Sequence, residues 1–77
     1  MKVSILNILI MAKIQLNGKK IDLKNRYSIL KLLKKYKINI KKTAIELNGN
    51  IISRNRYGLV YLKDKDKIEI VHFIGGG

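Results

Sequence analysis

Two Asn-Gly pairs constrain what this 77-residue chain can fold into more than any other feature of its sequence. Asn17-Gly18 and Asn48-Gly49 each lie beside runs in which polar and apolar residues alternate. An Asn-Gly pair in that setting is the strongest short-range signal of a β-hairpin. Residues 12–23 therefore predict one hairpin, and residues 43–47 and 50–52 predict the strands of a second.

One helix is predicted between the two hairpins. Ser28 suits its N-cap, because a serine hydroxyl can accept a free backbone N–H of the first turn. Apolar residues then recur at the spacing of one helical face: Ile29, Leu32, Leu33 and Tyr36. Four lysines fall away from that face: Lys31, Lys34, Lys35 and Lys37. We expect these lysines to form a solvated surface rather than an anion-binding site.

The strongest strand pattern is the last one, over residues 67–74. Before it, residues 59–62 predict a short helical turn or strand, and residues 64–66 predict a turn. The order of hairpin, helix, hairpin and strand predicts an α+β fold, in which one main helix packs on one face of a mixed four- to five-stranded sheet. The same periodicities predict the core: Ile14, Leu16, Ile21, Leu23, Ile29, Leu32, Leu33, Ile45, Leu47, Ile68 and Ile70.

Residues 1–10 are expected to be an N-terminal extension of a single domain that spans residues 11–77. They are apolar but too few to cross a bilayer, which takes about 20 apolar residues. The simplest interpretation is that Met11 is the true start and that the extension is dispensable. An additional strand and a hydrophobic anchor are the alternatives.

Composition excludes several classes of site. The chain has no cysteine, so disulfides, thiol chemistry and cysteine-based metal sites are excluded, and a reducing cytoplasm is the expected location. The formal net charge of +12 indicates either an acidic partner or a general compositional bias. Because the basic residues are dispersed along the chain, we favour the bias.

A catalytic constellation is also lacking in the sequence. His72 has no evident partner, and the acidic residues have no paired spacing typical of a metal site. Asp64 and Asp66 flank one lysine and are expected to stabilise a turn. The four tyrosines are not arranged on adjacent strands, as base stacking on a sheet would require. We therefore expect no enzyme, no metal and no bound cofactor, and we disfavour a nucleic-acid-binding module.

The C-terminal tail is the part of the sequence that can take part in a reaction. The final strand leads directly into Gly75, Gly76 and Gly77. Glycines make a thin tail that can enter a narrow channel, and the Gly77 carboxylate is sterically bare. Such a carboxylate becomes electrophilic once a partner enzyme converts it to an anhydride with AMP. Beside the tail, strand alternation is expected to turn three side chains outward as a partner-docking patch: Glu69, Val71 and Phe73.

These features together resemble the sulfur carrier proteins of thiamine biosynthesis, which are relatives of ubiquitin with the β-grasp fold. The resemblance covers residues 11–77 and rests on the opening strand, the helix from Ser28, residues 44–52, Arg54, Tyr57, Asp64-x-Asp66 and the Gly-Gly end. Two positions depart from the family pattern. Ser53 stands where proline is frequent, and Lys65 stands where the turn usually has glycine.

The resemblance implies a cycle of reactions at Gly77 in which the chain itself holds no cofactor. An E1-like adenylating enzyme would activate the carboxylate with ATP and Mg²⁺. Sulfur from a cysteine desulfurase persulfide would give a thiocarboxylate, and a thiazole synthase would consume it. The chain already ends at Gly77, so no maturation cleavage is expected. The alternatives are the small subunit of molybdopterin synthase, which is usually longer, and a small basic nucleic-acid-binding module.

Overall fold

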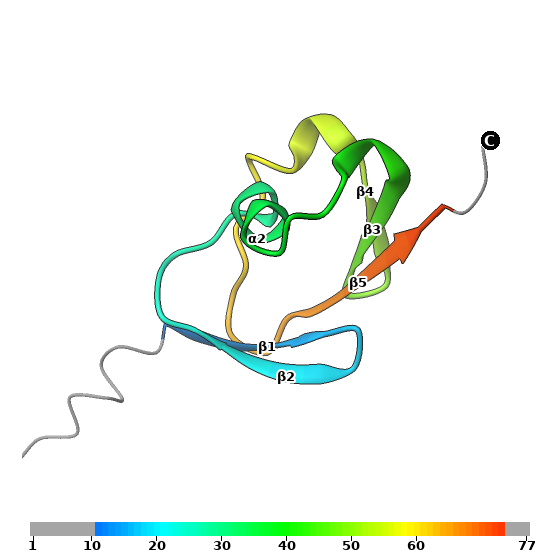
Figure 1. Ribbon diagram of the computed structural model, residues 1–77. Coiled ribbons are helices and arrows are strands. Elements are labelled where there is room, and N and C mark those ends of the chain that lie inside the picture. Colours follow the sequence, from blue (N-terminus) through cyan, green and yellow to red (C-terminus); the bar gives the residue numbers. More distant parts are fainter. Residues whose placement is uncertain (1–10, 74–77) are drawn as a thin grey trace, which may run out of the picture.

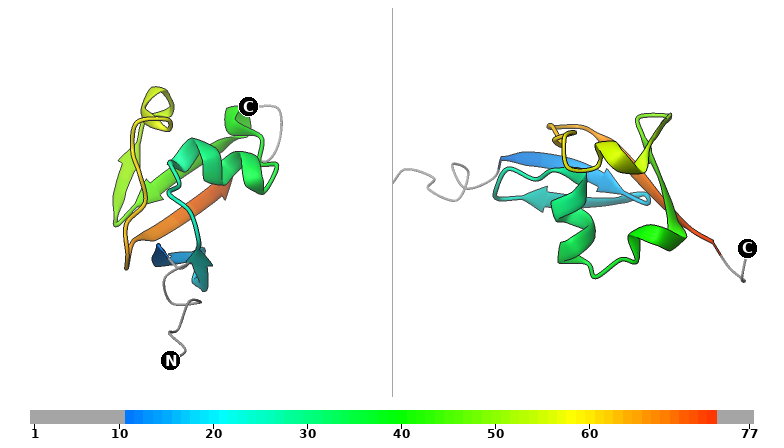
Figure 2. Two further views of the ribbon diagram at one scale, coloured as in Figure 1. Left: turned by 90° about the vertical axis from the view of Figure 1, so that its left-hand side faces the viewer. Right: turned by 90° about the horizontal axis from the view of Figure 1, so that it is seen from above.

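The computed structural model describes residues 11–73, and residues 1–10 and 74–77 lie outside the described part. A five-stranded sheet has the order β2-β1-β5-β3-β4, and helix α2 crosses one of its faces (Figures 1 and 2). The elements are β1 (Ala12–Leu16), β2 (Lys19–Leu23), α2 (Ile29–Lys35), β3 (Thr43–Leu47), β4 (Asn50–Ile52) and β5 (Lys67–His72), with 3-10 helices η1 (Ile40–Lys42) and η2 (Arg54–Arg56). The predicted α+β β-grasp fold is confirmed, with five strands.

Strand β5 is the centre of the sheet. On one side β5 runs parallel to β1, with Gln15 opposite Lys67. On the other side β5 runs antiparallel to β3, from Thr43 opposite His72 to Leu47 opposite Ile68. The sheet is therefore mixed, and the strand that leads to the C-terminal tail is held by a neighbour on each side.

Both predicted hairpins form, and their turns show why each needs Asn-Gly. Asn17 and Gly18 have φ angles of 49° and 84°, and Asn48 and Gly49 have 51° and 87°. Two consecutive residues with positive φ define the turn type that matches strand twist, and asparagine and glycine adopt that conformation at the lowest cost. The strands that they join are β1 with β2 and β3 with β4.

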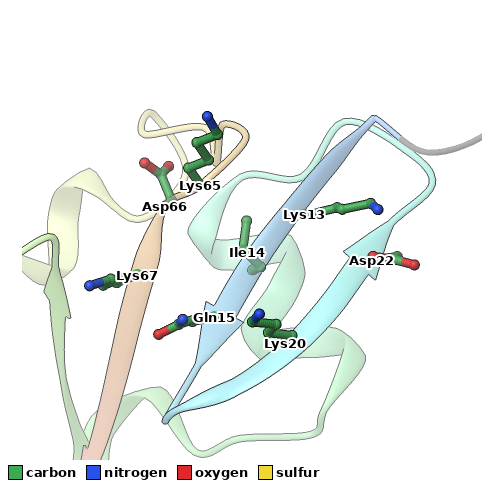
Figure 3. Close-up of a pocket in the computed structure, with 8 residues that line it drawn as sticks. All are labelled: Lys13, Ile14, Gln15, Lys20, Asp22, Lys65, Asp66 and Lys67. Carbon is green, nitrogen blue, oxygen red and sulfur yellow. The ribbon is translucent and has the colours of Figure 1, made fainter.

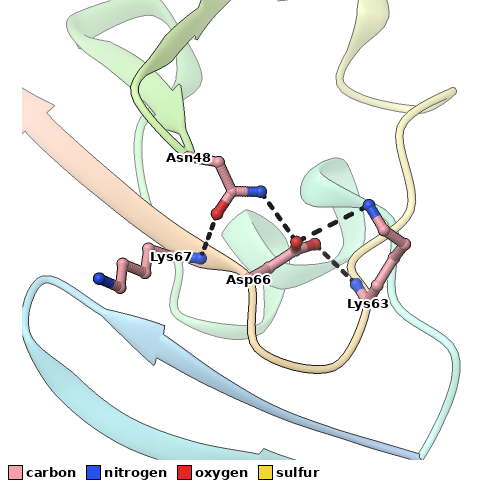
Figure 4. A network of polar contacts seen from close by, with 4 residues as sticks. All are labelled: Asn48, Lys63, Asp66 and Lys67. Carbon is pink, nitrogen blue, oxygen red and sulfur yellow. Dashed lines mark hydrogen bonds and ion pairs between the residues drawn. The ribbon is translucent and has the colours of Figure 1, made fainter.

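The asparagines also fix both hairpins to β5. The Asn17 carboxamide oxygen accepts a hydrogen bond from the Ile70 N–H (2.6 Å), and its nitrogen donates to the Ile70 carbonyl (3.2 Å). The Asn48 oxygen accepts from the Lys67 N–H (2.8 Å), and its nitrogen donates to the Asp66 carboxylate (2.9 Å; Figure 4). Each asparagine side chain therefore makes two hydrogen bonds: those of Asn17 both go to the β5 backbone, and those of Asn48 go to the β5 backbone and to the Asp66 carboxylate.

Helix α2 begins at its predicted N-cap. The Ser28 hydroxyl accepts a hydrogen bond from the Lys31 N–H (3.0 Å). At the other end, Tyr36 is the C-cap and is 43% exposed, so of the four residues with the spacing of one face only Ile29, Leu32 and Leu33 are buried. Lys37 has a φ of 55°, and the Ile38 N–H bonds back to the Leu33 carbonyl (2.9 Å). This left-handed ending turns the chain so that Ile38 packs against the core instead.

The core agrees with the periodicity, and its remaining members are Ala12 of β1 and three residues of the connections. Eight of the predicted core residues are buried: Ile14, Leu23, Ile29, Leu32, Leu33, Ile45, Ile68 and Ile70. Three others are half-buried and pack against these: Leu16, Ile21 and Leu47. Tyr27, Tyr57 and Leu62 are also buried, although they lie in connections without a regular period.

The connection from β4 to β5 differs from its prediction. Residues 54–56 form η2, whereas residues 59–62, predicted to be a short helical turn or strand, are assigned to neither a helix nor a strand. Tyr61 makes an isolated bridge to Ser28, and the carbonyls of Tyr57 and Val60 accept hydrogen bonds from the first N–H groups of α2 (2.9 and 3.0 Å). The segment is shaped by these contacts with the helix rather than by local alternation.

Candidate functional site

The alternation of β5 divides its side chains between the two faces of the sheet. Ile68 and Ile70 are buried under α2, whereas Glu69, Val71 and Phe73 are exposed. Val71 and Phe73 are each 54% exposed, a large fraction for apolar side chains. The predicted outward orientation of these three residues is confirmed.

The open face carries further side chains beside those of β5. Across the pairing with β3, Val71 lies opposite Ala44, and Glu69 lies opposite Glu46. Ile51 of β4 lies opposite Glu46 in turn and is 77% exposed. The sequence analysis did not include Ile51 in the patch. The Ile51-Ile52 doublet was the available signal, because in a strand one of two adjacent residues must face away from the core.

The last described residues are firmly attached to the sheet. His72 pairs with Thr43, and the Phe73 N–H donates a hydrogen bond to the Lys42 carbonyl (2.8 Å). Gly75, Gly76 and Gly77, the predicted tail and reactive carboxylate, lie outside the described residues. Four residues follow Phe73, and an extended chain of that length reaches at most about 14 Å.

The buried acid Asp66 has a structural role, as the turn prediction requires. Its carboxylate accepts hydrogen bonds from the Asn48 side chain (2.9 Å) and the Lys63 N–H (2.7 Å), and it lies 3.8 Å from the Lys63 ammonium group (Figure 4). Asp64 accepts a hydrogen bond from the Lys13 N–H (2.8 Å). Both carboxylates thus hold the turn before β5 in place.

Within residues 11–73, no group of three or more acidic or histidine side chains is arranged to hold a metal ion. His72 is exposed at the base of the tail, and its side chain has no hydrogen bond among those found there. A bilayer-spanning helix is likewise absent from this part of the chain, because none combines the required length and apolarity.

A shallow groove opens on the same face, where β1, β2 and the start of β5 meet (Figure 3). Its volume is about 410 Å³, and the Lys65 N–H closes one end by donating a hydrogen bond to the Lys13 carbonyl (2.7 Å). Four lysines line the groove: Lys13, Lys20, Lys65 and Lys67. The sequence analysis did not predict the groove, because its lysines are far apart along the chain.

Comparison with known proteins agrees with the fold. Residues 8–77 match the model of the ThiS family. The chain is 46% identical over 65 residues to the sulfur carrier protein ThiS of Bacillus subtilis, a match that covers 83% of this chain and 98% of that protein. It is 42% identical over 65 residues to a thiazole synthase of Magnetococcus marinus, a match that covers 84% of this chain and 20% of that protein.

A solved structure shows the same architecture. The crystal structure of the thiamine biosynthesis protein ThiS from Geobacter metallireducens matches with a TM-score of 0.74 at 28% identity. The match covers 84% of this chain and 99% of that one.

Proposed function

Because the chain belongs to the ThiS family and is a sulfur carrier of thiamine biosynthesis, we propose that the main-chain carboxylate of Gly77 is the group that carries the sulfur. The observation that supports this proposal most directly is the end of β5. The central strand of the sheet stops beside two exposed apolar side chains, Val71 and Phe73, only four residues before the carboxylate. A docked partner would therefore meet the tail and the patch together.

The chemistry belongs to the main chain and to the partner enzymes. A carboxylate oxygen of Gly77 attacks the α-phosphorus of ATP held with Mg²⁺ by an E1-like adenylating enzyme, and pyrophosphate leaves. The terminal sulfur of a persulfide, supplied through a cysteine desulfurase, then attacks the acyl carbon, and AMP leaves. A thiol reduces the resulting acyl disulfide, which leaves a thiocarboxylate on Gly77 and a disulfide on the thiol's side. The carrier contributes reach and position, since no side chain is needed for these steps.

The proposed acceptor of the sulfur is a thiazole synthase. One fifth of the Magnetococcus marinus thiazole synthase resembles this chain, which supports a functional connection between the two kinds of protein. The thiocarboxylate would donate its sulfur to the thiazole ring and return Gly77 to a carboxylate.

The alternative functions receive less support. The relatives described above belong to thiamine biosynthesis, which favours that pathway over molybdopterin synthesis. Base stacking on a sheet would need exposed aromatic rings on adjacent strands. Tyr27 and Tyr57 are buried, and the exposed rings of Tyr36, Tyr61 and Phe73 lie at the end of α2, in a connection and just after β5. Tyr61 is partly exposed, and the Arg26 guanidinium lies over its ring at 4.2 Å from the centroid.

The tail is tested by mass spectrometry of the intact protein after incubation with the adenylating enzyme, ATP and a sulfur source. We expect the mass increase that accompanies replacement of one oxygen by one sulfur. Deleting Gly77 should abolish loading, because it shortens the reach by about 3.3–3.6 Å. Gly76→Ala should impair loading more than Gly75→Ala, because a Cβ next to the reacting residue widens the tail where the channel is narrowest. Full loading of the deletion variant, or none of the intact chain, would refute the proposal.

The docking patch is tested separately. Replacing Val71 and Phe73 together by serine should weaken binding to the adenylating enzyme and leave the melting temperature unchanged, because neither side chain belongs to the core. Leu59→Ser is the matched control, since Leu59 is 71% exposed and lies away from the strands. Equal affinity of the double variant and the intact chain would show that partners bind elsewhere.

A further inference from the structure

The groove between β1, β2 and β5 has a net positive charge, because four lysines line it with two acids, Asp22 and Asp66. Asp22 is the exposed acid that lines it, and Asp66 lies buried beneath with its oxygens already hydrogen-bonded. The salt bridge found within residues 11–73 is the one from Lys63 to Asp66. Among the described residues none of the groove lysines makes a salt bridge, although Lys13 lies opposite Asp22 across the β1–β2 pairing.

Strand register places two of these charges on either side of one polar residue. Lys20 lies opposite Gln15 across the β1–β2 pairing, and Gln15 lies opposite Lys67 across the β1–β5 pairing. With strands about 4.8 Å apart, Lys20 and Lys67 stand roughly 10 Å from each other at the backbone. Each lysine is thus about 5 Å from Gln15 at the backbone, which is less than the Debye length of about 8 Å at physiological salt. The two fields therefore add over Gln15 and attract an anion there. The Gln15 carboxamide can donate a hydrogen bond to the same anion.

The pattern along β5 indicates which class of anion fits. Outward residues run from basic Lys67, through Glu69, to apolar Val71 and Phe73. Glu69 and Glu46 are directly opposite, a repulsive arrangement that becomes favourable when a cation covers it. A phosphate backbone lying along this face would meet that acidic pair. It would also find no aromatic side chain in the groove on which to stack a base.

We propose that the groove binds an acidic segment of the adenylating partner, the same protein that covers Val71 and Phe73. This inference rests on the proposed function and extends its docking surface. From Lys67 to Phe73 the open face spans roughly 20 Å along the strand. Standard interfaces bury about 800 Å² on each partner, which two apolar side chains alone do not provide. The groove supplies the additional area and, through its charge, the orientation of the complex.

The test compares two triple variants with the same change in net charge. The groove variant carries Lys13→Gln, Lys20→Gln and Lys67→Gln. The control carries Lys24→Gln, Lys34→Gln and Lys37→Gln, which remove three exposed lysines that do not line the groove. Both are made in the full chain, and circular dichroism melting verifies that each is folded. The measurement is the initial rate of sulfur loading against carrier concentration, between about 50 and 300 mM salt.

We expect the groove variant to raise the KM for the carrier about tenfold at low salt, with kcat unchanged and a weaker dependence of KM on salt. The control should change KM less than about twofold. A KM equal to that of the unmodified chain, or an equal rise in both variants, would overturn the groove proposal while the function stands. Absence of loading of the unmodified chain would instead refute the proposed function. As a third arm, binding of single-stranded DNA that the groove variant alone loses, without a change in KM, would assign the groove to nucleic acid and overturn the proposal.

Discussion

The two hairpins have the same turn and are joined to the central strand in different ways. The hairpin β3–β4 meets β5 along five antiparallel positions, from Thr43 to Leu47. The hairpin β1–β2 meets β5 at only two parallel positions, Gln15 and Leu16. Beyond this short backbone pairing, a side chain makes the next contacts between the strands. The Asn17 carboxamide hydrogen-bonds to the backbone N–H and carbonyl of Ile70. The comparison teaches that one dipeptide can shape a turn and also lengthen a sheet.

Of the variants proposed here, Asn17→Ala should lower the free energy of unfolding the most. It leaves the Ile70 N–H and carbonyl without their partner and places alanine at a φ of 49°. An unsatisfied buried group costs about 1–3 kcal/mol and a left-handed alanine about 1 kcal/mol more, so we expect a loss of roughly 2–4 kcal/mol. Urea unfolding measures the change, with Asn25→Ala, at an exposed connection residue, as control. A loss below about 1 kcal/mol would show that the short parallel pairing suffices by itself.

Asn48→Asp should cause the second-largest loss of stability, because it places a second carboxylate beside that of Asp66. The donor that lies 2.9 Å from Asp66 becomes a charged oxygen, and we expect a loss of about 1–3 kcal/mol at neutral pH. Urea unfolding at neutral pH measures the loss. The control is Asn48→Ala, which removes both hydrogen bonds of the side chain, including the one from the Lys67 N–H that aspartate can keep, and adds no charge. If Asn48→Asp unfolds at the same urea concentration as the unmodified chain, the two carboxylates do not repel each other appreciably.

Lys65→Gly should stabilise the side of the sheet that holds the first hairpin. Lys65 has a φ of 72° and lies in the turn before β5, where its own N–H donates a hydrogen bond to the Lys13 carbonyl. Relief of about 1–2 kcal/mol of left-handed strain exceeds the roughly 0.5–1 kcal/mol entropic cost of glycine. The net gain should be about 0.5–1 kcal/mol in the free energy of unfolding, measured in urea. Lys65→Ala separates the two contributions, because it removes the side chain but keeps the strain and should give no gain.

Ser53→Pro should give the smallest gain, on the side of the second hairpin. Ser53 follows β4 with a φ of −72°, which is near the value that proline imposes. Restricting the unfolded chain at a compatible position contributes about 0.4–1 kcal/mol, which here is offset in part by loss of the hydrogen bond from the Ser53 hydroxyl to Asn55. Thermal unfolding measures the difference, and Ser53→Ala corrects for the lost hydroxyl. A melting temperature lower than that of the alanine variant would mean that the proline ring clashes with its surroundings.

The local sequence pattern was sufficient to predict the fold where the chain forms regular strands and helix. Alternation and Asn-Gly identified both hairpins, and the apolar spacing with Ser28 located the helix. It did not indicate where the helix ends, because the left-handed Lys37 after the helix has no sequence signature as strong as glycine. Tyr57 and Leu62 are buried by contacts between distant segments, which periodicity does not record.

The candidate site likewise has a part that local pattern predicts and a part that it does not. Val71 and Phe73 were predicted because strand alternation alone turns them outward. The groove was not predicted, because Lys20, Gln15 and Lys67 come together only through the order in which β2, β1 and β5 pair. A charge count over the whole sequence conceals such a grouping, since dispersed lysines in the chain become neighbours across strands.

The attachment of β5 on both sides also has a mechanical consequence. A partner that draws the residues beyond Phe73 into a channel pulls along the axis of the central strand. The load is then shared by the hydrogen bonds to β1, by those to β3 and by the Phe73–Lys42 contact, all strained together in shear. An edge strand would instead peel away one bond at a time. The carrier can thus yield its last residues to an enzyme under tension while the domain that presents them stays folded.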